Sequence, residues 1–235
     1  MISVIIPALN AERHLPATLT ALVPAAIDGI VREVIVVDGG SRDHTREIAD
    51  LSGADIIDAE PGRGSQLVQG AKRARFPWLL FLHADTVLQD GWDRDAVNFI
   101  RGVDLGERPR AAGAFSFRLD DKGFAPRALE ALVRARCSLL GLPYGDQGLL
   151  ISRHLFDDVG GYRNLPIMED VDIVRRLGRK RVALLDAVAT TSADRYQREG
   201  YLARMIRNQV CLALYAAGLP IGTIVRIYGK AKTAP

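Results

Sequence analysis

The chain has 235 residues, of which 48% are hydrophobic and 25% are charged, and it carries a formal net charge of +3 with a pI of about 9.0. A chain of this length can bury a sizeable core, and its composition excludes intrinsic disorder, which combines low hydrophobicity with high net charge. The mildly basic charge suits an anionic small molecule or a membrane surface as partner, but it is too small to indicate nucleic-acid binding.

The first half of the chain alternates short apolar runs with helical patterns. Four runs predict buried strands, at residues 2–6, 33–37, 55–58 and 78–82. Three helical patterns lie between them, at residues 11–22, 41–53 and 65–73. Asn10 and Ser41 are the predicted N-caps of the first two helices, and Asp43 favours the dipole of the second. This order predicts an α/β fold with a parallel sheet that helices cover on both faces.

The second half is less regular, and we expect a smaller, mixed region there. Predicted strands cover residues 111–119, 147–152 and 182–185. Predicted helices cover residues 127–140, 170–177 and 198–217. No repeat, low-complexity segment or linker interrupts the sequence, so we predict a single domain over residues 1–235 whose two halves meet near residue 105.

Cysteine usage and hydropathy bound the cellular setting. Cys137 and Cys211 form no CxxC motif, so we expect neither a disulfide framework nor a zinc site, and a reduced, cytoplasmic location. We predict no signal peptide and no transmembrane helix, because no run of about 18 uncharged apolar residues occurs. The most apolar segment, residues 209–225, contains Gly218 and Pro220. We expect a helix packed on the core and then a turn, with a peripheral membrane contact as the alternative.

Polar residues follow the ends of the predicted strands, where sheets of this kind bind their ligands. The clusters are Asn10 with Glu12, residues 38–41, residues 63–66, and residues 83–85. One such cluster would mean little, but four of them together predict a single crevice.

Asp85 follows the last apolar strand of the first half, in the run His83-Ala84-Asp85. A carboxylate at the mouth of a sheet is costly without a partner, and a hard cation such as Mg²⁺ or Mn²⁺ supplies one. That cation would be held by the carboxylate, phosphate oxygens and water, and it would stabilise charge on a departing diphosphate. Taken alone, Asp85 is explained equally well as a helix cap or a turn residue.

Three other positions near the crevice also have two interpretations. Asp38 can accept hydrogen bonds from a pyrimidine base or serve as a turn residue. Glu12 can bind ribose hydroxyls or only favour a helix dipole. The turn at residues 61–66 joins backbone N–H groups with the Arg63 guanidinium at a helix start, which suits a phosphate group. This turn is neither a GxGxxG motif nor a P-loop.

Two acidic clusters lie in the second half. Asp146 and Gln147 precede a predicted strand, and Glu169 and Asp170 begin a predicted helix. A pair of carboxylates can orient an acceptor hydroxyl and remove its proton, although acidic residues at a helix start also simply favour the helix dipole. The basic run at residues 175–181 fits cations at a helix C-terminus, with an anionic acceptor or a lipid headgroup as the alternative.

Five segments occur in a recognisable order, at residues 4–12, 36–45, 62–64, 81–85 and 168–170. Together they resemble the family 2 glycosyltransferases of the GT-A fold, over about residues 2–180. The resemblance implies a Rossmann-like, mostly parallel sheet, with a nucleotide-sugar-binding half at residues 1–105 and an acceptor-binding half at residues 106–235. The segments at residues 83–85, 145–148 and 191–195 resemble a bacterial subgroup named for arsenosugar biosynthesis, a name that reflects genomic neighbourhood more than chemistry.

The resemblance also implies roles for individual residues. The nucleotide-sugar site would comprise Pro7, Ala8, Asn10, Glu12, Asp38, Gly39, Ser41, Arg63, Gly64, His83 and Ala84. Within it, Glu12 would meet the ribose, Asp38 the uracil ring, and Arg63 the base or the diphosphate. Asp85 would hold the metal. Asp170 would be the catalytic base, assisted by Glu169, and the sugar and acceptor site would be shaped by Asp146, Gln147 and Arg195.

The sequence departs from the family pattern at three places. His83 stands where the usual metal motif has its first aspartate, and Gly39 replaces the second aspartate of Asp-Asp-Gly-Ser. The first of these departures bears on metal affinity and on the ribose contact. The QxxRW motif of processive members is absent, which argues for transfer of one sugar.

We therefore expect transfer of one hexose from a UDP-sugar to a hydroxyl acceptor, with inversion and with Mg²⁺ or Mn²⁺ as cofactor, at the inner face of the membrane or in the cytoplasm. One alternative is a nucleotide-sugar-binding sensor or non-catalytic subunit. The other is a sugar-phosphate nucleotidyltransferase, which would carry a glycine-rich loop after the first strand, where this chain has Pro7-Ala8-Leu9-Asn10.

Overall fold

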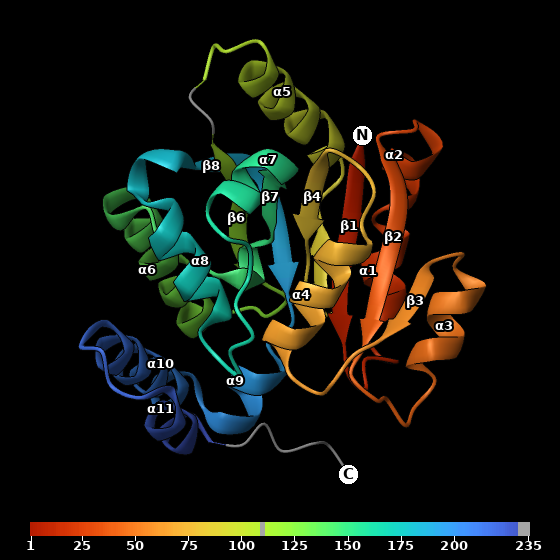
Figure 1. Ribbon diagram of the computed structural model, residues 1–235. Helices are drawn as coiled ribbons and strands as arrows, with labels where there is room; N and C mark the ends of the chain where they lie inside the picture. The colour runs from red at the N-terminus through yellow and green to blue at the C-terminus, as the bar shows by residue number, and fades with distance from the viewer. Residues whose placement is uncertain (109–110, 230–235) are drawn as a thin grey trace.

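The computed structural model describes residues 1–108 and 111–229, and within them eight strands form one mixed sheet with helices on both faces (Figure 1). The strands pair in the order β3-β2-β1-β4-β7-β6-β8-β5. Their bounds are Ile2–Ala8 (β1), Val31–Asp38 (β2), Asp55–Asp58 (β3), Trp78–Phe81 (β4), Thr86–Leu88 (β5), Ala112–Leu119 (β6), Leu149–Ser152 (β7) and Val182–Thr191 (β8).

The helices fall into two layers around this sheet, with a further group beside its second half. Their bounds are Leu15–Thr20 (α1), Val23–Ile27 (α2), Thr45–Leu51 (α3), Arg63–Arg73 (α4), Trp92–Asp104 (α5), Phe124–Leu140 (α6), Arg153–Asp158 (α7), Glu169–Leu177 (α8), Asp194–Glu199 (α9), Tyr201–Ala216 (α10) and Ile221–Tyr228 (α11). Two short 3₁₀ turns add Gly145–Gln147 (η1) and Arg179–Arg181 (η2).

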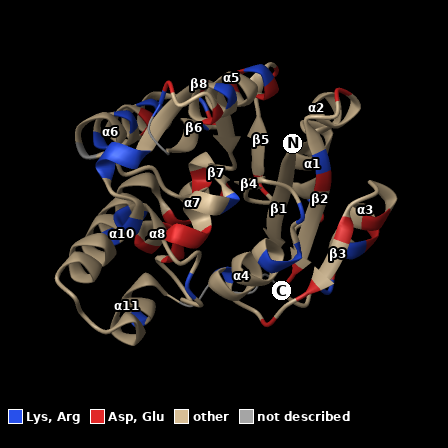
Figure 2. Ribbon diagram, turned by 45° about the horizontal axis from the view of Figure 1, so that its top comes forward, with Lys and Arg blue, Asp and Glu red and all other residues tan. Residues whose placement is uncertain are grey.

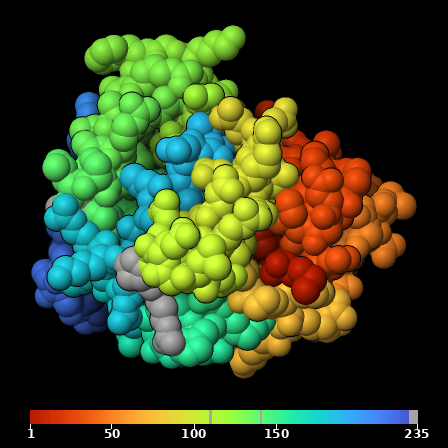
Figure 3. Space-filling model, turned by 90° about the horizontal axis from the view of Figure 1, so that it is seen from above, coloured from red at the N-terminus to blue at the C-terminus, as the bar shows by residue number. Residues whose placement is uncertain are grey.

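The side chains of β1 alternate between the two faces of the sheet, and each face packs against its own layer of helices. Ile2, Val4 and Ile6 pack in one buried cluster with side chains from α1, α3 and α5. Ile5 points to the other face and packs with α4, α7 and α8. Full burial of each such side chain contributes about 1.5–3 kcal/mol, so the strand is held from both sides. α5 also covers the end of the sheet opposite the crevice, as the view from above shows (Figure 3).

The parallel part of the sheet is confirmed. β1 pairs in parallel with β2 and β4, and β2 pairs in parallel with β3. The register brings Ala8 opposite Asp38 and Asp38 opposite Asp58, so the carboxyl ends of these strands meet at one edge. Beyond β4 the sheet becomes mixed, because β7 runs antiparallel to both β4 and β6 and β5 runs antiparallel to β8.

The predicted first helix, at residues 11–22, is wrong in its extent and in its cap. The chain instead forms α1 and α2, each with a proline in its first turn, which is where proline favours a helix start. Asn10 is not an N-cap: it adopts a left-handed conformation with φ of 49°. Ser41 is not an N-cap either, since α3 begins only at Thr45, whose N–H donates to Asp43 Oδ1 at 3.1 Å.

Several boundaries in the second half also differ from the prediction. α6 begins at Phe124, β7 begins at Leu149 because the preceding residues form η1, and β8 continues to Thr191. The predicted helix at residues 198–217 is interrupted at Gly200, where φ is 83°, so that α9 and α10 are separate helices. A turn then leads into α11, and β5, α5 and α7 are additional elements. Among the described residues, no helix combines the length and the apolar character needed to cross a membrane.

Candidate active site

The loops that follow β1 and β2 are bound to each other at the carboxyl edge of the sheet. The Asn10 N–H donates to Ser41 Oγ at 2.9 Å, and the Arg42 N–H donates to Asn10 Oδ1 at 2.9 Å. The His44 N–H donates to Glu12 Oε2 at 3.0 Å. Asn10 and Ser41 therefore fix the loop geometry, while the Glu12 side chain remains exposed beside them.

Asp38 ends β2 and is 1% exposed. Its carboxylate accepts a hydrogen bond from the Ser41 hydroxyl at 2.5 Å and pairs with Arg46 Nη1 at 3.1 Å. Arg46 also pairs with Asp58 at the end of the neighbouring β3. The predicted contact between Asp38 and a uracil ring would thus replace one of these partners.

Gln66, on α4, binds the backbone at the ends of β1 and β2, and its position accounts for the glycine at position 39. Its Nε2 donates to Ala8 O and to Val37 O, both at 2.7 Å. A Cβ atom on Gly39 would meet the same Nε2 at 3.1 Å, so a side chain there would require Gln66 to move by a few tenths of an ångström. Pro7 is half-buried and Ala8 is buried in the adjoining part of β1.

Arg63 begins α4 and connects the first half of the chain to the second. Its Nη1 lies 3.4 Å from Glu169 Oε1, and Glu169 is 1% exposed. Burial disfavours the charged guanidinium, but Glu169, Asp170 and Asp85 outweigh that cost and raise the pKa of Arg63. The following residue, Gly64, packs so closely that a Cβ atom would lie 2.4 Å from Leu165 O. The guanidinium is therefore fixed among three carboxylates.

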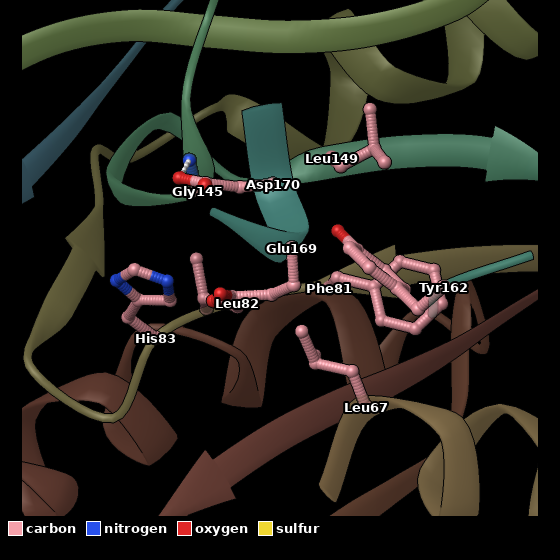
Figure 4. Close-up of a pocket in the computed structure, with 9 residues that line it drawn as sticks. All are labelled: Leu67, Phe81, Leu82, His83, Gly145, Leu149, Tyr162, Glu169 and Asp170. Carbon is pink, nitrogen blue, oxygen red and sulfur yellow. Dashed lines mark hydrogen bonds between the residues drawn. The ribbon is translucent and has the colours of Figure 1, made fainter. Parts of the chain in front are cut away.

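Figure 4 shows the pocket at which His83, Gly145 and Asp170 meet. The Gly145 N–H donates to Asp170 Oδ2 at 2.9 Å. A Cβ atom on Gly145 would lie 2.7 Å from His83 Nε2 and 3.2 Å from Asp170 Oδ2, so any other residue there would require one of these side chains to shift. Burial, followed by Arg63 and Arg195, lowers the pKa of His83 well below its usual value, so this imidazole is neutral at neutral pH. The neighbouring Ala84 is buried, and its carbonyl accepts from the Thr18 hydroxyl at 2.9 Å.

Asp146, in η1, has a buried carboxylate oxygen, Oδ1, without a hydrogen-bond partner in the part of the chain that the structure describes. Burial raises the pKa of Asp146 to about 6, with Asp170 and Asp85 acting in the same direction and Arg136 opposing them. A buried, unpaired carboxylate oxygen costs about 1–3 kcal/mol, so a ligand that donates to it or coordinates it would recover that energy.

The neighbouring Gln147 lies inside the protein. It is 1% exposed, its Nε2 donates to Phe115 O at 2.8 Å, and its Oε1 accepts from the Cys137 thiol at 3.2 Å. The hydrogen bonds of its amide are therefore made within the protein. Gln147 fixes the turn that carries Asp146.

Arg195, on α9, completes the positive side of the crevice. Desolvation and the nearby Arg63 lower the pKa of Arg195, while Asp85 and Tyr228 oppose them, so these four side chains share one electrostatic environment. Tyr228 comes from α11 and accepts a hydrogen bond from Arg204 Nη2 at 3.2 Å. Two neighbouring guanidiniums with one carboxylate between them suit a diphosphate.

The carboxylates of the crevice fit a hard divalent cation whose remaining coordination positions are filled by a bound ligand and water. Within residues 1–108 and 111–229, the Asp85 carboxylate accepts no hydrogen bond, and no three His, Cys, Asp or Glu side chains form a metal-binding cluster. Asp85 and the unpaired oxygen of Asp146 are electrostatic neighbours, and both offer oxygen donors. Such a sparse protein set leaves coordination positions for phosphate oxygens and water, as Mg²⁺ commonly has.

Sequence reasoning missed two aromatic residues of the site. Tyr162 lines the pocket of Figure 4 and packs edge-on against Phe81 at 4.8 Å between ring centroids. Tyr144 lies beneath the Arg136 guanidinium, 3.7 Å from its ring centroid. Only Tyr144 had a local signal, because it directly precedes the Gly-Asp-Gln-Gly segment.

Residues 3–116 match the family model described as "Glycosyl transferase family 2". This part, just under half of the chain, is similar to that family. The match runs from β1 into β6 and includes Arg63 and Asp85, whereas Asp146 and Asp170 lie beyond it.

Similar proteins agree with that family. A curated relative, glucosyl-3-phosphoglycerate synthase from Mycobacterium tuberculosis, is 33% identical over 95 residues, which are 37% of this chain and 29% of the relative. Another, a PGL/p-HBAD biosynthesis glycosyltransferase from Mycobacterium bovis, is 34% identical over 103 residues, or 38% of this chain and 37% of the relative. The matches thus span less than two fifths of either relative's length.

The whole fold has solved counterparts. A crystal structure of the M. tuberculosis synthase in complex with Mn²⁺, UDP and glucosyl-3-phosphoglycerate superposes with a TM-score of 0.59 at 25% identity, covering 94% of this chain and 81% of that one. The predicted α/β GT-A fold is therefore confirmed, with a mostly parallel part in the first half and a mixed part in the second.

Proposed function

We propose that this protein is a glycosyltransferase that moves one sugar, a hexose, from a UDP-sugar to a hydroxyl acceptor with the help of Mn²⁺ or Mg²⁺. The observation that carries the proposal is the convergence of Arg63, Asp85, Asp146 and Asp170 at the carboxyl edge of the sheet, although these residues are far apart in sequence. The similar M. tuberculosis structure, which contains UDP and Mn²⁺, supports this reading. The finer resemblance to the arsenosugar-named subgroup stays a prediction.

The first half of the chain, to about residue 105, would bind the donor. Glu12 is the exposed carboxylate of the β1–β2 loop pair and would accept hydrogen bonds from ribose hydroxyls. Arg63 and Arg195 would bind the diphosphate, since both guanidiniums lie in the environment of Asp85. Asp85, with donor phosphate oxygens, would hold the cation, which when bound neutralises charge on the departing UDP.

The second half, from about residue 106, would activate the acceptor. Asp170 Oδ2 accepts from the Gly145 N–H and its Oδ1 accepts from the Val171 N–H, which hold the carboxylate in one orientation. Asp170 would take the proton of the acceptor hydroxyl as that oxygen bonds to the anomeric carbon and the bond to the UDP phosphate oxygen breaks. Attack opposite the leaving group inverts the anomeric centre. Glu169 would keep Arg63 in place.

The test measures UDP release from a panel of UDP- and GDP-sugars with Mn²⁺, with and without candidate hydroxyl acceptors. We expect release with a UDP-sugar, and loss of release in Asp85→Ala while the exposed control Asp28→Ala retains it. Tight UDP-sugar binding without turnover on any acceptor would instead favour a sensor. Equal release in the wild type and Asp85→Ala would refute the metal role.

A further inference from the structure

α10 exposes its apolar residues and buries a charged one, the reverse of an ordinary surface helix. Its exposed residues are Leu202, Ala203, Ile206, Gln209, Val210, Ala213 and Ala216, and none of them is charged. Leu202 is 70% exposed and Ile206 is 55% exposed. By contrast Arg204 is 8% exposed, pointing inward to Glu199 at 3.0 Å. The spacing of Leu202, Ile206, Val210 and Ala213 places them along one side of the helix, which we call the α10 stripe.

The two helices beside α10 continue this character. α6 exposes Leu132 (55%) and Leu139 (66%), and α11 exposes Ile227 (43%). In Figures 1 and 2 the three helices lie together at the side of the molecule away from α3. α6, α9 and α10 also share a small buried cluster, which includes Val133 and Met205. The exposed apolar side chains therefore gather on one side of the second half.

The net charge on these helices is positive. α6, α10 and α11 contain six arginines and one acidic residue, which gives +5 against +3 for the whole chain. The acidic residue, Glu130, is 7% exposed and pairs with Arg127 at 2.6 Å. The exposed arginines are Arg127, Arg134 and Arg226, and no acidic residue of these helices is exposed. Figure 2 shows α10 and α11 without any acidic position.

We propose that the outer face of α6, α10 and α11 docks on an anionic phospholipid bilayer. Apolar side chains along a helix lying in the interface enter the acyl boundary, and arginines beside them attract anionic headgroups. A symmetric contact between two copies of this face would bring arginines against arginines, so charge favours the lipid surface over a second copy. Interfacial binding needs no helix that spans the bilayer, in line with the helices described.

Docking in this way would place the acceptor side of the crevice at the lipid surface. The inner sides of α10 and α11 contribute Cys211 and Ile224 to the cluster that contains Met168 and Val171, next to the carboxylates at the start of α8. If the proposed glycosyl transfer is correct, the acceptor hydroxyl belongs to a molecule carried in that bilayer. This consequence rests on the proposed function, whereas the docking itself does not.

The test is co-sedimentation of the full chain, without nucleotide sugar, with vesicles of phosphatidylcholine alone or of equal parts phosphatidylcholine and phosphatidylglycerol. We expect sedimentation with the anionic vesicles that weakens as salt is added. Replacing Ile206 and Val210 together by aspartate should lower the affinity by about tenfold or more. Leu51→Asp is the matched control, because Leu51 is 80% exposed on α3, away from this face, and should bind as the wild type does.

A second pair of variants guards against misfolding of the first. Arg134→Gln with Arg226→Gln removes two exposed charges and should lower binding to anionic vesicles by roughly fivefold for each arginine, with an unchanged circular-dichroism melting curve. The proposal is overturned if the wild type ignores anionic vesicles at low salt, or if both variant pairs bind as the wild type does. It is also overturned if the wild type is a dimer that the aspartate pair dissociates and no vesicle binding occurs. Because no donor is present, these outcomes leave the proposed transferase reaction to its own test.

Discussion

The two walls of the crevice differ in how their charges are satisfied. On the β1–β2 wall, Asp38 is paired with Arg46 and bonded to Ser41, and Glu12 accepts from a backbone N–H. On the α8–η1 wall, Asp146 Oδ1 has no hydrogen-bond partner in the described residues, and the Asp85 carboxylate, in the loop between β4 and β5, accepts no hydrogen bond there either. The groups of the first wall therefore already have their hydrogen-bond partners. The groups of the second wall need a ligand to complete their hydrogen bonding or coordination.

Removing the proposed base, Asp170, should give the largest effect on activity, because the acceptor hydroxyl then has no group to take its proton. Asp170 belongs to the α8–η1 wall. Asp170→Asn keeps the shape and the bond from Gly145 but cannot take a proton. We expect kcat to fall by about 10²–10⁴-fold. UDP affinity, measured by isothermal titration calorimetry, should stay unchanged, since the proposed UDP contacts (Glu12, Arg63 and the cation at Asp85) do not include Asp170. A fall in UDP affinity that equals the fall in kcat would contradict the division between the walls.

Adding one methyl group at Gly145 should destabilise the α8–η1 wall, because the glycine lies close to His83 and Asp170. Gly145→Ala forces its Cβ to within 2.7 Å of His83 Nε2, so His83 or Asp170 must shift. We expect a loss of about 2–3 kcal/mol of unfolding free energy in urea titrations. Gly222→Ala, on α11, is the control, because no heavy atom lies within 4 Å of its Cβ position. Equal stability of both variants would mean that the close approach at Gly145 is not rigid.

Neutralising Asp146 should stabilise the ligand-free protein, and only above a certain pH. The folded-state pKa of Asp146, about 6, lies above the ~4 of an unfolded aspartate, so ionisation costs stability as the pH rises from ~4 to ~6. Asp146→Asn should therefore gain about 1–2 kcal/mol at pH 8 and nothing at pH 4. Urea unfolding at the two pH values measures this difference. A gain of equal size at both pH values would show that the side chain's charge is not its cause.

The smallest effect should come from the satisfied wall. Asp43 Oδ1 accepts from the Thr45 N–H at the start of α3, and its Oδ2 accepts from the Glu12 N–H at 3.0 Å. Asp43→Ala removes these acceptors together with the one for the Thr45 hydroxyl, and we expect a loss of about 1 kcal/mol. Thermal unfolding against Asp50→Ala, near the end of the same helix, measures it. A loss of several kcal/mol would mean that this wall is held by one residue and not by a network.

The sequence predicted the parts of this fold that depend on local pattern. The apolar runs of β1, β2, β3 and β4 are short, periodic and separated by helices, so their existence and parallel order were readable. The first helix was predicted wrongly because Pro16 and Pro24 start two separate helices, α1 and α2. The Asn10 side chain does not cap a helix, because it accepts a hydrogen bond from the Arg42 N–H in the loop after β2. Caps are local in sequence, but here a contact from a distant loop decided the outcome.

The candidate site shows the same limit. Grouping Arg63, Asp85, Asp146 and Asp170 at one edge was possible because each follows a strand or begins a helix. The burial of Gln147 could not be predicted, because it depends on a hydrogen bond to Phe115 O in β6. The sequence does not show how close β6 lies to Gln147. Nor was the inward turn of Arg204, which depends on α9 and α11 packing around α10. Residue type indicated chemistry, while tertiary contacts decided which side chains were free to perform it.

We propose that Asp85 holds a cation only together with the donor diphosphate. Electron paramagnetic resonance of Mn²⁺ titrated with the protein, with and without UDP, tests this directly. We expect weak Mn²⁺ binding without UDP and binding at least about tenfold tighter with UDP. This gain should be lost in Asp85→Ala but not in Asp28→Ala. Mn²⁺ binding that is independent of UDP, or a gain that survives in Asp85→Ala, would contradict it.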